Sequence, residues 1–210
     1  MNIQKASAEL HKGFDKLNKA LFGGKLPEAA ITIQSQGRKK GVLGWCTVGE
    51  VWNDKEGNSK KYEINITAEY LNRPMNEVME TLLHEMIHLH NNVNGIKDTS
   101  RGYTYHNKKY KEQAEAHGLN VEHHDKIGWS LTSLTSETER LINGFGLDKR
   151  AFEMARLHFG GAESGKGKGS SQSKWICGCG TAIRATKEIN VTCDDCGEKF
   201  VKEEKEDAEG

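Results

Sequence analysis

The chain has 210 residues, of which 30 are basic and 30 acidic, so its formal net charge is zero. This length suits one domain of moderate size, or one domain with a small additional module, and it is sufficient to bury a core without disulfide bonds. The charge balance excludes a uniformly basic nucleic-acid-binding protein but allows a local basic surface. The sequence has no run of about 18 apolar residues that could span a membrane, and its first ten residues lack the features of a secretory signal. We therefore expect a soluble, cytoplasmic protein.

The first third of the sequence changes from a helical to a strand-like pattern. Apolar residues at intervals of three and four predict a helix over residues 7–22, with one face formed by Leu10, Phe14, Leu17 and Leu21. Residues 30–68 instead show a two-residue alternation, for example at Tyr62, Ile64 and Ile66, which is typical of strands in a small sheet. The polar residues 53–59 indicate a turn that joins two antiparallel strands.

Helices are expected again in the middle of the chain. The second begins near Asn72 and ends before Gly95, and apolar residues on most of its circumference predict that it is buried. A third helix is expected over residues 106–117. One or two shorter helices should follow between Ser136 and Phe159. This order of strands and helices indicates an α+β fold.

The second helix contains His84-Glu85-Met86-Ile87-His88, which is an H-E-x-x-H motif. Histidines four residues apart project from the same face of a helix, so both imidazoles can reach one zinc ion. Glu85 can then act as general base toward a zinc-bound water, whose pKa the metal lowers. Ionisable residues in an otherwise apolar helix are costly without a metal, so we favour a zinc site over hydrogen-bonded core histidines. Such a site suits the hydrolysis of peptide bonds.

A catalytic zinc ion usually takes three protein ligands and leaves one position open. The candidates for the third ligand are His90, His106, Glu112, Glu115, His117, His123 and His124. His90 faces the wrong side of its helix. His106 is better placed, because the turn-rich residues 91–102 would bring the chain back and His106 would open the next helix. His117 and His123 are expected at the surface, whereas His124 stays an alternative third ligand. Glu112 or Glu115 as the third ligand would place the protein in a different subclass of the zinc enzymes with this motif.

The cysteines predict a second zinc site. Four of the five lie within twenty residues, in a C-x-C and a C-x-x-C pair formed by Cys177, Cys179, Cys193 and Cys196. Two such pairs can hold one zinc ion with four thiolates, which leaves no open position and makes the ion structural. We therefore expect a zinc ribbon over residues 174–202. The lone Cys46 is expected to be a small buried hydrophobic residue.

The residues around the ribbon indicate how it is attached and what it contacts. Nine of the fourteen residues 160–173 are Gly or Ser, which predicts a flexible linker, and residues 203–210 form an acidic tail. Residues 166–202 carry seven basic against four acidic side chains. A nucleic acid could therefore bind with its phosphate backbone on these basic side chains and with one base stacked on Trp175. The alternative is a ribbon that is purely structural or that binds a protein. Further candidate contacts are the basic run 38–40 and two tryptophans more typical of a core, Trp45 and Trp52.

Three segments together resemble the SprT-like (Spartan-type) zinc metalloproteases. They are residues 70–75 (YLNRPM), 82–88 (LLHEMIH) and 102–110 (GYTYHNKKY), and the resemblance extends over residues 7–200. It implies a zincin-like protease domain with His106 as the third zinc ligand, Tyr110 as the aromatic residue four positions later, and a C-terminal zinc ribbon. It also implies activation by DNA and cleavage of proteins bound or crosslinked to DNA.

The sequence thus predicts a zincin-like protease domain over residues 1–159, followed by the linker, the ribbon and the tail. We expect a zinc endopeptidase with one catalytic and one structural Zn²⁺. Its partners would be protein substrates and DNA of single-stranded character, without a membrane. The alternatives are a non-catalytic zinc adaptor that binds DNA or protein, against which the general base Glu85 argues, and a zinc hydrolase of small molecules.

Overall fold

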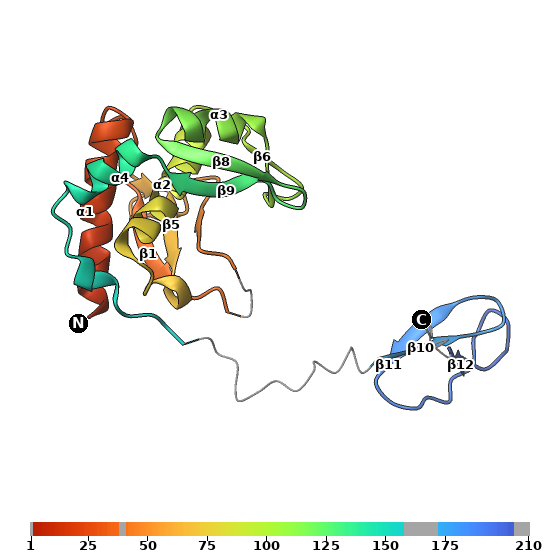
Figure 1. Ribbon diagram of the computed structural model, residues 1–210. Coiled ribbons are helices and arrows are strands. Elements are labelled where there is room, and N and C mark those ends of the chain that lie inside the picture. Colours follow the sequence, from red (N-terminus) through yellow and green to blue (C-terminus); the bar gives the residue numbers. More distant parts are fainter. Residues whose placement is uncertain (1, 38–40, 158–171, 204–210) are drawn as a thin grey trace, which may run out of the picture. The chain divides into compact units, whose positions relative to one another are not determined.

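The computed structural model describes residues 2–37, 41–157 and 172–203 (Figure 1). The chain divides into two compact units, Met1–Phe159 and Gly160–Gly210. Three of the predicted segments lie outside the described residues. They are the basic run 38–40, nearly all of the linker, including Lys166 and Lys168, and all of the acidic tail except its first residue. The boundaries of linker and tail therefore stay predictions.

The first unit mixes helices with small sheets, which confirms the α+β class. The α-helices are α1 (Ile3–Leu21), α2 (Met75–Val93), α3 (Lys108–Ala116) and α4 (Ser136–Asn143), and two 3₁₀ helices are η1 (Ala68–Tyr70) and η2 (Lys149–Phe152). The strands are β1 (Ala30–Gln34), β2 (Gly44–Cys46), β3 (Trp52–Asn53), β4 (Lys60–Lys61), β5 (Glu63–Thr67), β6 (Thr99–Ser100), β7 (Tyr105–His106), β8 (Leu119–His124) and β9 (Gly128–Leu134).

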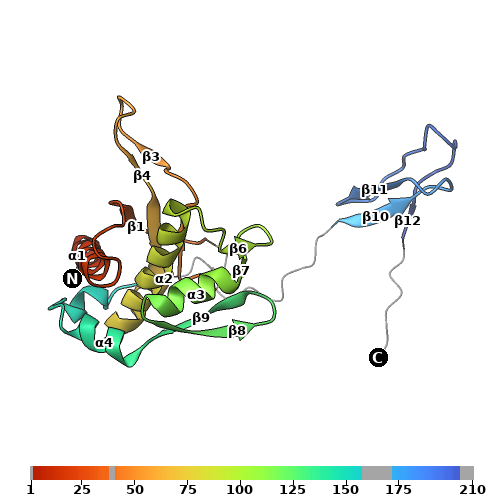
Figure 2. The same ribbon diagram turned by 90° about the horizontal axis from the view of Figure 1, so that it is seen from above.

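Three sheets organise the described part of this unit. In the order β1-β5-β2, the central strand β5 runs parallel to β1 and antiparallel to β2, so β2 forms an edge. The short strands β3 and β4 form an antiparallel hairpin around the polar residues 53–59, as predicted, and this hairpin projects from the unit (Figure 2). The third sheet has the order β6-β7-β9-β8, and only its β8–β9 hairpin consists of long strands.

Helix α2 lies in the middle of the unit, between α1 and α3 (Figure 2). Its fully buried residues include Val78, Met79, Leu82, Leu83, Met86, Ile87 and Leu89. On α1, Gly13 allows close packing, because a Cβ atom there would lie 2.7 Å from the sulfur of Met79. Since neighbouring elements cover α2 on most sides, side chains in its middle are held by the core of the unit.

The structure differs from the sequence-based expectations at several points. Helix α1 begins earlier than predicted, because the side chain of Asn2 accepts a hydrogen bond from the backbone of Lys5 and caps the helix. The prediction that His106 opens the third helix is wrong, since His106 lies in β7 and Asn107 caps α3. Trp52 is 48% exposed on the projecting hairpin, so it is not a core residue. The β8–β9 hairpin was not predicted.

Residues 172–203, the described part of the second unit, contain a small three-stranded antiparallel sheet with the order β11-β10-β12. Its strands are β10 (Ser173–Ile176), β11 (Ala182–Ala185) and β12 (Val201–Lys202). Its buried core consists of Trp175, Cys177, Cys193 and Phe200. In the described part of the chain, no helix has both the length and the apolar composition needed to cross a membrane.

Candidate metal centres

Three histidine side chains converge in the first unit. The Nε2 atom of His106 lies 3.2 Å from Nε2 of His84 and 3.0 Å from Nε2 of His88. Two ligands held tetrahedrally at about 2.0–2.1 Å from zinc are about 3.3 Å apart, so these separations fit a single zinc ion. Imidazole nitrogens are also common zinc ligands. The three side chains therefore form a suitable donor set for Zn²⁺.

Distant parts of the chain build this group. His84 and His88 lie one helical turn apart on α2 and project from one face. His106 reaches them because its strand β7 pairs with β6 at Thr99 and with β9 at Gly128. The third donor is thus supplied by sheet pairing and not by the helix that follows.

A buried aromatic ring supports the three imidazoles. The ring centroid of Tyr110 lies 4.8 Å from that of His84, 4.7 Å from that of His88 and 4.6 Å from that of His106. Tyr110 is completely buried. The aromatic residue that the family resemblance singled out therefore packs against all three histidines.

The outer ring nitrogens, Nδ1, differ in their surroundings. Nδ1 of His88 lies 2.7 Å from a carboxylate oxygen of Asp98, and Nδ1 of His84 lies 3.3 Å from the hydroxyl of Thr132. Nδ1 of His106 is buried and has no hydrogen-bond partner among the described residues. Sequence reasoning missed Asp98 and Thr132, because no local pattern connects them to the motif.

The three histidines differ in the pKa of their imidazole groups. Burial, reinforced by the two neighbouring imidazoles, holds the pKa of His84 well below its usual value. Burial and His88 likewise lower the pKa of His106 to about 4. Burial also acts to lower the pKa of His88, but the hydrogen bond to Asp98 and the charge of Glu85 outweigh it and raise that pKa. Neutral imidazoles, as at His84 and His106, are the form that binds a metal.

Glu85 lies beside the histidines and is only 5% exposed. Burial raises the pKa of its carboxyl to about 7, against the opposing effects of His88 and of a hydrogen bond with the Cys46 backbone. A carboxyl group with a pKa near neutrality can both accept and release a proton at physiological pH. Its position is suitable for a general base that is not itself a metal ligand.

Gly44 on β2 leaves the space that this carboxylate occupies. A Cβ atom at Gly44 would lie 3.2 Å from Oε1 of Glu85, 3.1 Å from Cγ2 of Thr81 and only 2.8 Å from the backbone oxygen of Asn65. The backbone oxygen belongs to the neighbouring strand and cannot move independently. An added methyl group would therefore displace β2, the Glu85 carboxylate or both.

We expect Gly44→Ala to destabilise the first unit by about 1–3 kcal/mol, which is typical of overpacking. The matched control is Gly49→Ala, because a Cβ atom at Gly49 would meet no atom within 4 Å. Thermal unfolding of both variants measures the effect. A Gly44→Ala protein with wild-type stability would show that this space is not required.

The other candidate ligands lie away from the three Nε2 atoms. His90 contacts the rings of Phe22 and His117 at the opposite side of α2. His123 packs against Trp129, and Glu115 forms an ion pair with Lys111. Among the described residues, the two groups of side chains that could hold a metal ion are His84, His88 and His106, and the four cysteines. His124 and Glu112 belong to neither.

A cleft of about 720 Å³ opens above the histidines. His84, Glu85, His88 and His106 line it, and the edge strand β2 contributes three consecutive residues, Gly44, Trp45 and Cys46. Further apolar side chains, including Val48, Ile96 and Ile127, complete its walls. The candidate metal ligands and the buried carboxylate are therefore accessible to a molecule in the cleft.

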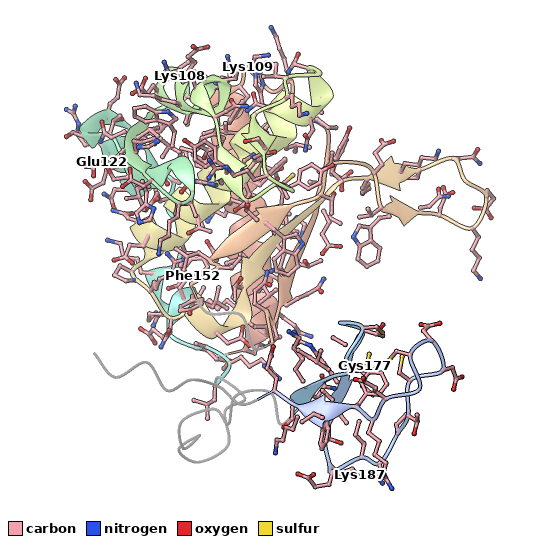
Figure 3. All side chains as sticks on the ribbon, turned by 90° about the vertical axis from the view of Figure 1, so that its right-hand side faces the viewer. Lys108, Lys109, Glu122, Phe152, Cys177 and Lys187 are labelled. Atoms are coloured by element: carbon pink, nitrogen blue, oxygen red, sulfur yellow. The ribbon has the colours of Figure 1, made fainter. Side chains whose placement is uncertain are left out.

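The four cysteines of the second unit also converge. Cys177, which is labelled in Figure 3, belongs to a group whose sulfur atoms all lie within 4.8 Å of one another. The sulfur atoms of Cys179 and Cys193 are 3.8 Å apart, and those of Cys177 and Cys179 are 3.1 Å apart. Thiolates bound tetrahedrally at about 2.3 Å from zinc are about 3.8 Å apart, so the group has the number and proximity of ligands for four-coordinate zinc, with Cys177 and Cys179 closer together than in the zinc-bound state. Each pair lies in a turn that ends at a glycine with left-handed φ, Gly180 at 88° and Gly197 at 72°. Hydrogen bonds with Thr181 lower the pKa of the Cys179 thiol, which favours its thiolate form.

The interpretation of Trp175 as a base-stacking residue is wrong. Trp175 is 5% exposed and packs in the core of the second unit with Phe200. Lys174 and Arg184 lie directly opposite each other on β10 and β11, and strand alternation places them on the face opposite Trp175. The basic residues and the aromatic ring therefore do not share one surface.

The sequence was compared with known proteins and families. Residues 10–127 match the sequence model of the SprT-like family, and this range contains the three histidines, Glu85 and Tyr110 but none of the four clustered cysteines. Searches of curated proteins and of solved structures gave no significant match. Because the family match extends over more than half of the sequence, the chain belongs to the SprT-like family.

Proposed function

We propose that the protein is a zinc endopeptidase with a zincin-type domain over residues 1–159. The observation that carries this proposal is the convergence of three histidine Nε2 atoms beside a buried carboxylate at the base of an accessible cleft. His84, His88 and His106 would hold Zn²⁺. Bound there, zinc would supply a Lewis acid that polarises a peptide carbonyl and makes water a stronger nucleophile.

The residues of the chain would perform the remaining steps. An extended substrate can pair with the edge strand β2, which lines the cleft beside the histidines. The Glu85 carboxylate would accept a proton from the attacking water and then deliver it to the amide nitrogen that leaves. The apolar walls of the cleft would exclude other water from this proton transfer.

The proposal includes DNA as activator and DNA-bound or DNA-crosslinked proteins as substrates. Two observations support this part. The chain belongs to the SprT-like family, and the second unit carries Lys174 and Arg184 opposite each other on one sheet face, where Arg184 is exposed and Lys174 is half-buried and forms an ion pair with Glu203. Two basic side chains in such positions suit contact with a phosphate backbone. The four-cysteine unit would then be a structural zinc ribbon that brings the protease to DNA.

Cleavage of a DNA-binding protein by the zinc-loaded full chain tests this function. We expect fragments when single-stranded DNA is present and few or none without it. His106→Ala should abolish cleavage, whereas the matched control His124→Ala, on the exposed end of β8, should not. Cleavage that is equal with and without DNA would contradict activation by DNA. No cleavage by a protein with both sites zinc-loaded would favour a non-catalytic adaptor.

A further inference from the structure

The ring of His84 is connected to a carboxylate through a hydroxyl group. Its Nδ1 atom lies 3.3 Å from Oγ1 of Thr132, and that oxygen lies 2.6 Å from Oε1 of Glu80. Glu80 is on α2, one helical turn before His84, and Thr132 is on β9. These three groups form a continuous chain of hydrogen bonds from the helix to the third sheet and back.

The single proton of the Thr132 hydroxyl determines the direction of these bonds. In the bond between Thr132 and Glu80 the Thr132 hydroxyl is the donor, as expected for an oxygen of an ionised carboxylate, which only accepts hydrogen bonds. The Thr132 oxygen can then only accept from the ring, which places a proton on Nδ1 of His84. In a neutral imidazole this leaves the lone pair on Nε2, the atom that faces His106.

His88 has a direct version of the same arrangement. Its Nδ1 atom lies 2.7 Å from Oδ2 of Asp98, which is 4% exposed and also accepts a hydrogen bond from the side chain of Asn91 at 2.9 Å. Both histidines of the motif thus have a carboxylate behind them. In one case the contact is direct and in the other it passes through Thr132.

We propose that Thr132 and Glu80 are positioning residues for the zinc site, which orient His84 and fix its tautomer as Asp98 does for His88. This rests on the proposed function, because it assigns these residues a role toward the zinc ion that the three histidines would hold. Hydrogen bonds to the outer nitrogen of a zinc-binding histidine orient the ring and increase its basicity, and their loss typically reduces metal affinity about 10–100-fold. Neither residue touches the reacting atoms.

Thr132→Val tests the proposal, because it removes the hydroxyl but keeps the branched shape. Its conservative counterpart is Thr132→Ser, which keeps the hydroxyl. The matched control is Ser130→Ala, since the Ser130 hydroxyl is buried on the same strand and has no hydrogen-bond partner among the described residues. Zinc would be titrated out of the full chain with a competing chelator. The histidine ring signals in ¹⁵N NMR would report this site separately from the cysteines.

We expect Thr132→Val to bind zinc about 10–100-fold more weakly and to lose the hydrogen-bonded Nδ1–H signal of His84. Thr132→Ser should restore both properties, and Ser130→Ala should resemble the wild type. Glu80→Ala should weaken zinc binding in the same direction, because the Thr132 hydroxyl would no longer be held as an acceptor.

The experiment distinguishes a failure of the proposed function from a failure of the positioning role of Thr132. A wild-type protein whose histidine signals do not respond to zinc would contradict the proposed function. A wild type that binds zinc, with Thr132→Val equal to it in affinity and in the His84 signal, would overturn the positioning role alone. Weak binding by Thr132→Ser as well would show that the hydroxyl is not the cause, and would also overturn it.

Discussion

Glu85→Gln is expected to abolish peptide cleavage while the protein still binds zinc. The amide has nearly the shape of the carboxyl group but cannot accept a proton from water, and a positioned general base typically contributes about 10²–10⁴-fold to the rate. Zinc would be held by the Nε2 atoms of the three histidines, and the Glu85 carboxyl group is not one of these ligands. Because burial already raises the pKa of Glu85 to about 7, a neutral side chain at this position should not destabilise the fold.

The cleavage rate, the zinc content and the thermal unfolding of the same preparation show separately whether Glu85→Gln loses activity, metal or stability. The matched control is Glu77→Gln, an exposed glutamate in the first turn of the same helix, which should cleave at the wild-type rate. A Glu85→Gln protein that cleaves as fast as the wild type would refute the role of Glu85 as general base. If it lost zinc instead, the measurement would point to a role of the carboxylate in metal binding.

The second large effect is expected from Cys193→Ser in the second unit, the proposed zinc ribbon. Among the described residues of that unit, the buried core consists of four, two of which are cysteines, so hydrophobic burial alone is insufficient to hold it. Structural zinc contributes about 10–16 kcal/mol to the folding of such small units. Loss of one thiolate should therefore unfold residues 172–203, and the zinc content should fall from two ions per chain to one.

Zinc analysis together with the NMR signals of β10 and β11 measures this result. The matched control is Cys46→Ser, because Cys46 belongs to neither candidate group of metal ligands among the described residues. It should retain both zinc ions. A folded second unit in Cys193→Ser, without zinc at the remaining cysteines, would show that the metal is not required for its fold.

The helical part of the site was predictable because its determinants are local. Apolar residues at helical intervals placed α1 and α2, and the spacing of His84 and His88 placed both on one face of a helix. His106 was less certain from spacing alone, and its neighbourhood was assigned to a helix instead of a strand. The strand β7 exists because His106 pairs with residues on both sides, Thr99 and Gly128, and no local pattern specifies such pairing.

The supporting residues were not predictable for the same reason. Glu80 and Thr132 are 52 residues apart in sequence, and only the packing of β9 against α2 brings them together. The exposure of Trp175 was predicted incorrectly for another reason. Its basic neighbours suggested an exposed ring, but in a strand adjacent side chains point to opposite faces, so Lys174 is directed away from the face where Trp175 packs.

The position of the histidines within α2 has a consequence for metal exchange. His84 lies nine residues after the first residue of the helix, Met75, and His88 lies five residues before its last, Val93. Fraying of the helix ends therefore does not reach them, and the core around α2 would hold the ligands in place even after an ion departs. A chelator should then empty this site through the cleft and leave a folded unit behind, whereas in the ribbon the metal and the fold would be lost together.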